Sequence, residues 1–200
     1  MNDNTEGKWF KKWFDTPYYH ILYSNRNEEE AKLFVENLVS YLDLNDADYC
    51  LDLACGKGRH AVNLNTHGLR VLGLDLSENS IKAAKDFEND SLKFDVHDMR
   101  RVYQGEQFDA ILNLFTSFGY FDDDADNYKA LKAIHNSLTE TGFGVIDFMN
   151  VDYVLENLVP NEVKSVDGID FHIKRYVKDG YIFKEIDFEE QLVKVQFYNR

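Results

Sequence analysis

The segment Cys50–His60 reads Cys-Leu-Asp-Leu-Ala-Cys-Gly-Lys-Gly-Arg-His, and it limits the possible folds of this 200-residue chain more than any other segment. Its apolar start predicts a strand. Gly56 and Gly58 allow a tight turn that a ligand can approach closely, because neither residue has a Cβ. A helix that begins at Arg59 would point its first backbone amides at that ligand. The segment therefore predicts a strand, a ligand-binding turn and a helix.

A second strand ends in an acid at the spacing typical of nucleoside-binding units. Residues 70–76 read Arg-Val-Leu-Gly-Leu-Asp-Leu, and Asp75 comes 19 residues after Gly56. A carboxylate at this position can accept hydrogen bonds from ribose hydroxyls. The unit predicts nucleoside binding, but it fits a dinucleotide as well as a smaller nucleoside.

Three acids recur at equal intervals along the strands. Asp52, Asp75 and Asp98 are each 23 residues apart, and each lies near the carboxyl end of an apolar segment. A fourth apolar segment, Phe108–Phe115, contains Asn113. Helical segments separate these strands, and such alternation predicts an α/β fold with right-handed crossovers. We expect a doubly wound, Rossmann-like, mostly parallel sheet.

Taken together, these segments resemble the class I S-adenosylmethionine-dependent methyltransferases. Four stretches carry the resemblance, namely residues 51–60, 73–77, 97–99 and 108–115. It extends over residues 30–150. The resemblance implies that the chain binds S-adenosyl-L-methionine and moves its methyl group to a small-molecule acceptor by in-line displacement.

The resemblance also implies roles for individual residues. The loop from Ala54 to Gly58 would pass under the methionine part of the cofactor, Asp75 would bind the ribose, and Asp98 would accept from the adenine amino group. Ala54 stands where many relatives have glycine, and we expect it to be tolerated through a negative φ. The implied cofactor-binding residues are Asp52, Ala54, Cys55, Gly56, Gly58, Asp75, Leu76, Asp98, Met99, Asn113, Tyr23 and Arg26.

Candidates for acceptor binding and catalysis are fewer. Tyr18 and His20 precede the first core helix, and Tyr120 follows the fourth strand. The alternative role for the tyrosines is packing between segments. The family's Asn/Asp-Pro-Pro-Tyr motif is absent, and Asn113-Leu-Phe-Thr stands in its place. This difference argues against methylation of a nucleobase or amide nitrogen, but the sequence does not identify the acceptor atom.

The composition of the chain limits the kinds of partner that we expect it to bind. The formal net charge of −14 disfavours nucleic acid, which is bound mainly through Lys and Arg. Cys50 and Cys55 are too few for a zinc site or a disulfide framework, so we expect no metal. The polar start has no apolar signal core, and no segment has the length of a membrane helix, so we expect a cytoplasmic protein without a membrane partner.

The sequence predicts three regions. Residues 1–44 are expected to form a helical cap or lid, residues 45–150 the cofactor-binding Rossmann-like core, and residues 151–200 an antiparallel strand meander. Asp167-Gly168 and Asp179-Gly180 are hairpin-turn signals within the meander. These strands either replace the helix and strand pair that usually close the family's sheet, or are an insertion in a chain without them. We favour the second alternative, which would leave a sheet edge exposed and predicts a homodimer.

Two other functions fit the same cofactor turn. A nicotinamide-dependent oxidoreductase would use it for a dinucleotide, although no clear hydride-transfer constellation of the Tyr-x-x-x-Lys or His/Asp kind accompanies the turn. A non-catalytic, cofactor-binding regulatory protein would retain the fold without transferring a methyl group. Each alternative predicts a result with added ligand that differs from the result expected for methyl transfer, which is the leading hypothesis.

Overall fold

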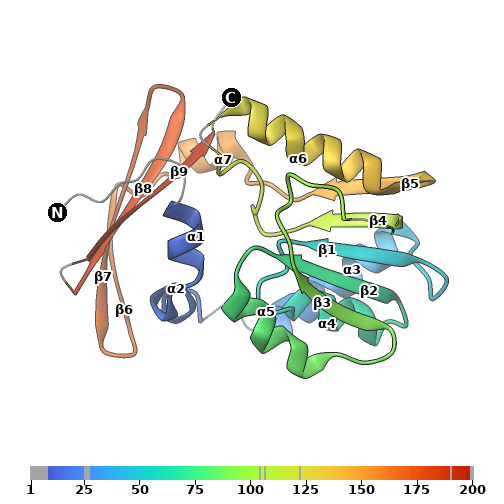
Figure 1. Ribbon diagram of the computed structural model, residues 1–200. Coiled ribbons are helices and arrows are strands. Elements are labelled where there is room, and N and C mark those ends of the chain that lie inside the picture. The colour runs from blue at the N-terminus through green and yellow to red at the C-terminus, as the bar shows by residue number, and fades with distance from the viewer. Residues whose placement is uncertain are drawn as a thin grey trace. The chain divides into compact units, whose positions relative to one another are not determined.

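The computed structural model describes residues 9–24, 28–103, 105, 107–121, 123–189 and 191–198. The chain divides into two compact units (Figure 1). The larger unit consists of Arg26–Phe118 and Asp123–Phe148, and the smaller unit consists of Met1–Asn25, Gly119–Asp122 and Met149–Arg200. The smaller unit is therefore assembled from three separate stretches of sequence.

The larger unit is built on a parallel sheet of five strands. In spatial order the strands are β3 (Leu92–Val96), β2 (Arg70–Asp75), β1 (Tyr49–Leu53), β4 (Phe108–Asn113) and β5 (Leu138–Ile146). The expected α/β, Rossmann-like class is confirmed. The strand order reverses direction between β1 and β4, which is where open parallel sheets of this kind form a ligand crevice at their carboxyl ends.

Helices cover both faces of this sheet (Figure 1). They are α3 (Glu28–Leu42), α4 (Arg59–Thr66), α5 (Glu78–Ala84), the short 3-10 helix η1 (Lys85–Phe87) and α6 (Asp124–Ser137). Because side chains alternate along a strand, each strand feeds two cores. One core joins Val71 and Leu112 to Val35 of α3 and Leu64 of α4. The other joins Leu51, Leu53, Leu72, Leu74 and Ile111 to Ile134 of α6.

The smaller unit contains the antiparallel meander that the sequence predicts. Its sheet has the order β6 (Asn161–Val166), β7 (Ile169–Lys178), β8 (Tyr181–Phe188) and β9 (Gln191–Tyr198). Asp167-Gly168 and Asp179-Gly180 join β6 to β7 and β7 to β8, and all four residues have φ between +50° and +81°. Positive φ at both central residues is typical of the tight turns that match the twist of a hairpin.

Three short helices complete the smaller unit: α1 (Trp9–Phe14), α2 (Pro17–Leu22) and α7 (Val151–Glu156). Trp13 and Leu22 are buried against Phe171 and Phe188 of the sheet. Pro17 begins α2, where a missing backbone N–H costs nothing, and the Thr16 side chain accepts from the Tyr19 amide. Aromatic burial therefore holds the first helices of the chain on its last strands.

Strand β5 is an edge of the parallel sheet. Within the described residues it pairs with β4 alone, and the meander forms a separate sheet. Phe143 and Ile146 of β5 are 36% and 38% exposed. The homodimer that this edge suggests stays a prediction. In the described part of the chain, each helix is too short or too polar to cross a bilayer.

Candidate active site

The turn after β1 brings backbone amides to the carboxyl end of the sheet. The amides of Ala54 and Cys55 both donate to the Leu74 carbonyl, at 2.7 and 3.0 Å. Gly56 has φ +57°, and a Cβ built on it would meet no atom within 4 Å. A Cβ on Gly58 would lie 2.6 Å from the Phe94 ring. Gly56 therefore leaves open space beside the turn, whereas Gly58 permits close packing where α4 begins.

Ala54 adopts a backbone conformation that the sequence analysis did not foresee. Its φ is +67°, so the expectation of a negative φ was wrong. The left-handed region costs a residue with a Cβ about 1–2 kcal/mol. The two amide bonds to the Leu74 carbonyl flank this residue, and the turn is thus held in strained geometry next to the glycines.

Asp75 is fixed by the same turn. Its Oδ2 accepts from the Gly56 amide at 2.8 Å, and its Oδ1 accepts from the Ser77 amide at 2.8 Å. The carboxylate therefore connects the glycine turn to the start of α5. Since a carboxylate oxygen can accept more than one hydrogen bond, Asp75 can keep both amide bonds and still accept from the hydroxyl groups of a ligand.

Asp52 is a buried acid with an unsatisfied oxygen. Its side chain is 1% exposed, and among the described residues its Oδ2 has no hydrogen-bond partner. Burial raises the pKa of Asp52 to about 7, the nearby Asp75 charge adds to the rise, and the Ala61 amide and Arg59 oppose it. A buried carboxylate without a full set of donors is costly, so a ligand donor would stabilise it.

Asn113 repeats this pattern at the end of β4. Its side chain is 1% exposed and its Nδ2 donates to the Leu53 carbonyl at 2.8 Å. Its Oδ1 is also without a partner in the described part of the chain. Adjacent strands β1 and β4 therefore each end near a buried acceptor with spare capacity, and two such acceptors suit a ligand group rich in N–H donors, such as an ammonium.

The end of β3 carries Asp98 and Met99. Burial acts to raise the pKa of Asp98, but hydrogen bonds and charge from Arg100, with a smaller contribution from the charge of Arg101, outweigh it and hold that pKa below its usual range. Met99 is partly buried and packs against the core on the α6 side of the sheet. Leu76, directly after β2, is also partly buried. These three residues lie on the loops that follow β2 and β3.

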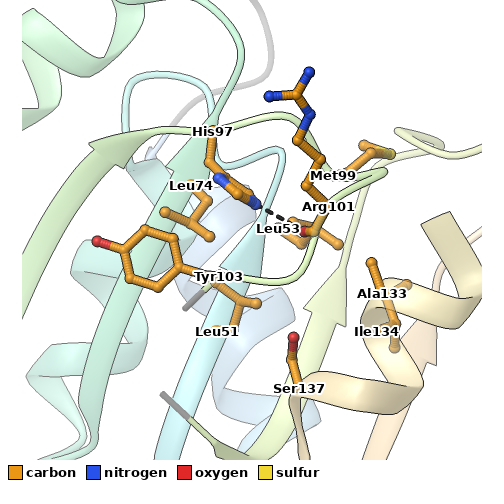
Figure 2. Close-up of a pocket in the computed structure, with 10 residues that line it drawn as sticks. All are labelled: Leu51, Leu53, Leu74, His97, Met99, Arg101, Tyr103, Ala133, Ile134 and Ser137. Carbon is orange, nitrogen blue, oxygen red and sulfur yellow. Dashed lines mark hydrogen bonds between the residues drawn. The ribbon is translucent and has the colours of Figure 1, made fainter. Parts of the chain in front are cut away.

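A small hollow opens beside Met99 on the α6 side of the sheet (Figure 2). The His97 ring donates from Nε2 to the Arg101 carbonyl at 2.8 Å and packs edge-on against Tyr103. The wall is mostly apolar and consists of Leu51, Leu53, Leu74, His97, Met99, Arg101, Tyr103, Ala133, Ile134 and Ser137.

Of the remaining predicted residues, Tyr18, His20, Tyr23 and Tyr120 belong to the smaller unit. Tyr18 donates to Glu189 at 3.0 Å, and the Tyr23 hydroxyl accepts from Lys184 at 2.6 Å. The Tyr120 ring lies 5.3 Å from that of Phe14, and the His20 ring lies 5.3 Å from that of Tyr19. Arg26 lies outside the described residues. Roles for these five residues in cofactor binding or catalysis remain predictions.

Some features of the site were not predicted. His60 is 8% exposed and stacks on Phe115 with ring centroids 4.8 Å apart. Burial lowers the pKa of His60 to about 4, with a further contribution from Arg59. Phe115 and Thr116 have φ of +57° and +56°. The only sequence signal was the position of His60 in the glycine-rich segment, since a stack across 55 residues of chain has no local pattern.

Asp147 holds the two strained residues in place. Its Oδ2 accepts from the Phe115 amide at 2.9 Å, and its carbonyl accepts from the Thr116 amide at 3.1 Å. Positive φ at a bulky residue followed by a β-branched one is uncommon and persists only where the surroundings enforce it. The end of β4 is thus a second strained segment at the same edge of the sheet.

The fold and this edge together agree with the resemblance to the class I S-adenosylmethionine-dependent methyltransferases. A glycine turn follows β1, a fixed acid ends β2, and buried acceptors with spare capacity lie at the ends of β1 and β4. These residues fit a nucleoside cofactor that also carries an amino group.

Comparison with known proteins supports the resemblance to methyltransferases. Residues 50–142 match the protein family described as "Methyltransferase domain". Among curated proteins, the glycine/sarcosine N-methyltransferase of Parasynechococcus marenigrum is 31% identical over 144 residues, a match covering 68% of this chain and 49% of that protein. The chain spans 70% of the length of one curated relative and 26–61% of the others that we compared.

Solved structures share the fold. An S-adenosylmethionine-dependent methyltransferase from Clostridium acetobutylicum gives a TM-score of 0.69 at 20% identity, over 92% of this chain and 79% of that one. CalS10, an amino pentose methyltransferase from Micromonospora echinaspora solved with S-adenosylmethionine bound, gives 0.68 at 19% identity, over 92% and 84%.

Residues 50–142 therefore form a methyltransferase domain, and the resemblance expected from the sequence is confirmed. Its cofactor is S-adenosylmethionine, as expected.

Proposed function

We propose that this chain transfers the methyl group of S-adenosylmethionine to an amine nitrogen of a small molecule. The observation that carries the proposal is the buried, unsatisfied Asp52 carboxylate below an open glycine turn whose amide binds Asp75. The amine acceptor is supported by the names of relatives: one acts on glycine and sarcosine, and one on an amino pentose.

Methyl transfer from a sulfonium depends more on how the protein positions the donor and the acceptor than on reactive side chains. The bound cofactor supplies an electrophilic methyl on a sulfonium, and alignment of donor and acceptor can contribute about 7–11 kcal/mol of barrier lowering. Asp75 would orient the ribose, because its carboxylate is immobilised by two backbone amides. Asp52 and Asn113 would bind and orient donors of the amino acid part, because each retains a buried acceptor.

Ligand binding tests the cofactor role of Asp75. By calorimetry, S-adenosylhomocysteine should bind the wild-type chain, and Asp75→Ala should lose at least tenfold in affinity because charge-assisted hydrogen bonds contribute about 1.5–3 kcal/mol each. Asp86→Ala removes an exposed acid of η1 and serves as the control. Equal affinity in Asp75→Ala and Asp86→Ala would contradict the proposed site.

The same preparation separates methyl transfer from the two alternatives. A nicotinamide-dependent oxidoreductase would be stabilised against heat by NAD and not by S-adenosylhomocysteine. A regulatory protein would bind S-adenosylmethionine and never release a methylated product. Incubation with methyl-labelled cofactor, first with glycine, sarcosine and amino sugars and then with their hydroxyl analogues, should label the amines alone. Label on the hydroxyl analogues alone would overturn the amine assignment.

A further inference from the structure

Arg100 joins the carboxylates of two different elements of the larger unit. Its Nε lies 3.0 and 3.1 Å from Oδ1 and Oδ2 of Asp98, and its Nη2 lies 2.6 Å from Oδ2. Its backbone amide donates to Oδ1 of the same residue at 3.0 Å. Its Nη1 donates to Asp126 at 2.5 Å. The planar guanidinium of Arg100 therefore grips Asp98, in that Nε and Nη2 form a fork that binds its carboxylate, while Nη1 binds Asp126 of α6.

This grip determines both the charge and the direction of Asp98. The Asp98 side chain is 18% exposed and that of Arg100 is 33% exposed, so the pair is only partly screened by water. The pKa of Asp98 is held below its usual range although burial opposes this, so the side chain remains an acceptor without a proton. Three N–H groups of Arg100 bond to the carboxylate, which has about four acceptor positions.

The link to α6 makes the grip rigid. Asp126 lies in the first turn of α6 and also accepts from Lys129 at 2.6 Å. Ala130, Ala133 and Ile134 bury the inner face of α6. The loop after β3 is therefore tied to a helix that is anchored in the core, and Arg100 cannot move without breaking an ion pair at each end.

We propose that Arg100 is a positioning residue for recognition of the adenine base: it holds the ionised Asp98 carboxylate where the exocyclic amino group donates to it. This inference rests on the proposed function and on the expectation from the family resemblance that Asp98 accepts from the adenine amino group. A fixed acceptor should reject hypoxanthine, which presents a carbonyl oxygen where adenine has an amino group. Sites built to bond one polar group discriminate strongly against its absence, whereas a mobile acceptor adapts.

The test is the ratio of two affinities. Calorimetry with S-adenosylhomocysteine and S-inosylhomocysteine should give a ratio of at least tenfold in the wild-type chain. In Arg100→Gln this ratio should fall to about threefold or less, mainly because S-adenosylhomocysteine binds more weakly. Arg100→Lys keeps the charge without the planar fork and should recover only part of the ratio. General loosening of the fold would weaken both ligands alike and leave the ratio unchanged.

Two further variants separate the contributions. Arg101→Gln removes the neighbouring exposed cation, whose guanidinium points away from the apolar wall in Figure 2, and should keep the wild-type ratio. Asp126→Asn removes the charge that pairs with Arg100 on α6 and should give an intermediate ratio, because the hydrogen bonds of Arg100 to Asp98 remain.

The outcomes distinguish the inference from its premise. Failure of the wild-type chain to bind S-adenosylhomocysteine would overturn the proposed function. An unchanged ratio in Arg100→Gln, or tighter binding of S-adenosylhomocysteine by that variant, would overturn the role of Arg100 alone. If Arg100→Gln does not fold by circular dichroism, Arg100→Lys and Asp126→Asn provide the same comparison, and wild-type ratios in both would overturn it.

Discussion

At the scale of residues, backbone strain lies at the carboxyl ends of β1 and β4. Ala54, Phe115 and Thr116 all have φ between +56° and +67°. Each is held by hydrogen bonds from its own segment to a neighbouring strand end or loop. Strain of this kind persists where the surrounding structure enforces it, and it is typical of ligand-binding sites.

Replacing Ala54 by glycine should relieve part of this strain. We expect Ala54→Gly to raise the free energy of unfolding by up to about 1 kcal/mol, because relief of the left-handed penalty exceeds the extra entropy of an unfolded glycine. Urea denaturation measures the change. Ala83→Gly, in helix α5, is the matched control and should lower the free energy of unfolding by about 0.5–1 kcal/mol. Equal destabilisation by both variants would contradict the strain at Ala54.

The raised pKa of Asp52 predicts a pH-dependent stability. Because its pKa is about 7 in the folded chain and 3.8 for an ordinary carboxyl, its stabilising contribution is complete below pH 3.8 and is lost as the pH rises through 7. Between pH 5 and pH 8 the wild-type chain should lose about 2–3 kcal/mol relative to Asp52→Asn, which mimics the protonated acid. Urea denaturation at both pH values measures this difference, and parallel pH profiles would exclude it.

At the scale of elements, local pattern predicted the helices and strands of the parallel sheet, while β5 differed. Gly142 is a local turn signal after α6, but β5 begins at Leu138 and runs through Gly142. The register with β4 shifts between Phe108 and Ala110, and this irregularity lets the chain enter the sheet early. Tertiary pairing overrode the turn signal of Gly142, and no local pattern could reveal it.

Gly142 is required by this irregular pairing. A Cβ on Gly142 would lie 2.7 Å from the Phe108 carbonyl oxygen and 2.9 Å from the Thr139 hydroxyl. Gly142→Ala should therefore cost about 1–3 kcal/mol of stability, because backbone must shift to make room. In Gly144→Ala the nearest atom is a methyl of Ile134 at 3.3 Å, and the loss should be smaller. Thermal denaturation of both variants compares them, and a smaller loss for Gly142→Ala would count against this geometry.

The residues of the candidate site also fall into those that the sequence predicts and those that it does not. The glycine turn, Asp52 and Asp75 follow from spacing within the sequence, because parallel strands end at one edge of a sheet. The grip of Arg100 on Asp126 and the stack of His60 on Phe115 join residues 26 and 55 positions apart. Such contacts depend on how α4 and α6 pack on the sheet, which residue spacing does not encode.

At the scale of the whole molecule, an exposed sheet edge coexists with a large negative charge. β5 presents Phe143 and Ile146, while the chain carries a net charge of −14. An unpaired edge favours strand pairing with another chain, whereas like charge opposes association at low salt. Self-association should therefore strengthen as salt screens the charge.

Sedimentation velocity tests the predicted homodimer. The wild-type chain should form dimers at high protein concentration and moderate salt, and Ile146→Lys should remain monomeric because it places a charge on the β5 edge. Tyr41→Lys places the same charge at an aromatic residue of α3 that is 87% exposed, and should dimerise like the wild type. A monomeric wild-type chain under all these conditions would refute self-association through β5.

In the proposed site, protonation of Asp52 would couple cofactor binding to the proton concentration of the solvent. A carboxyl that is about half protonated at neutral pH must release its proton when an ammonium group arrives beside it. The buffer takes up that proton, so the heat of binding measured near pH 7 should differ between phosphate and Tris, which have different ionisation enthalpies. In Asp52→Asn that dependence on buffer should vanish, and the difference counts the protons exchanged per cofactor bound.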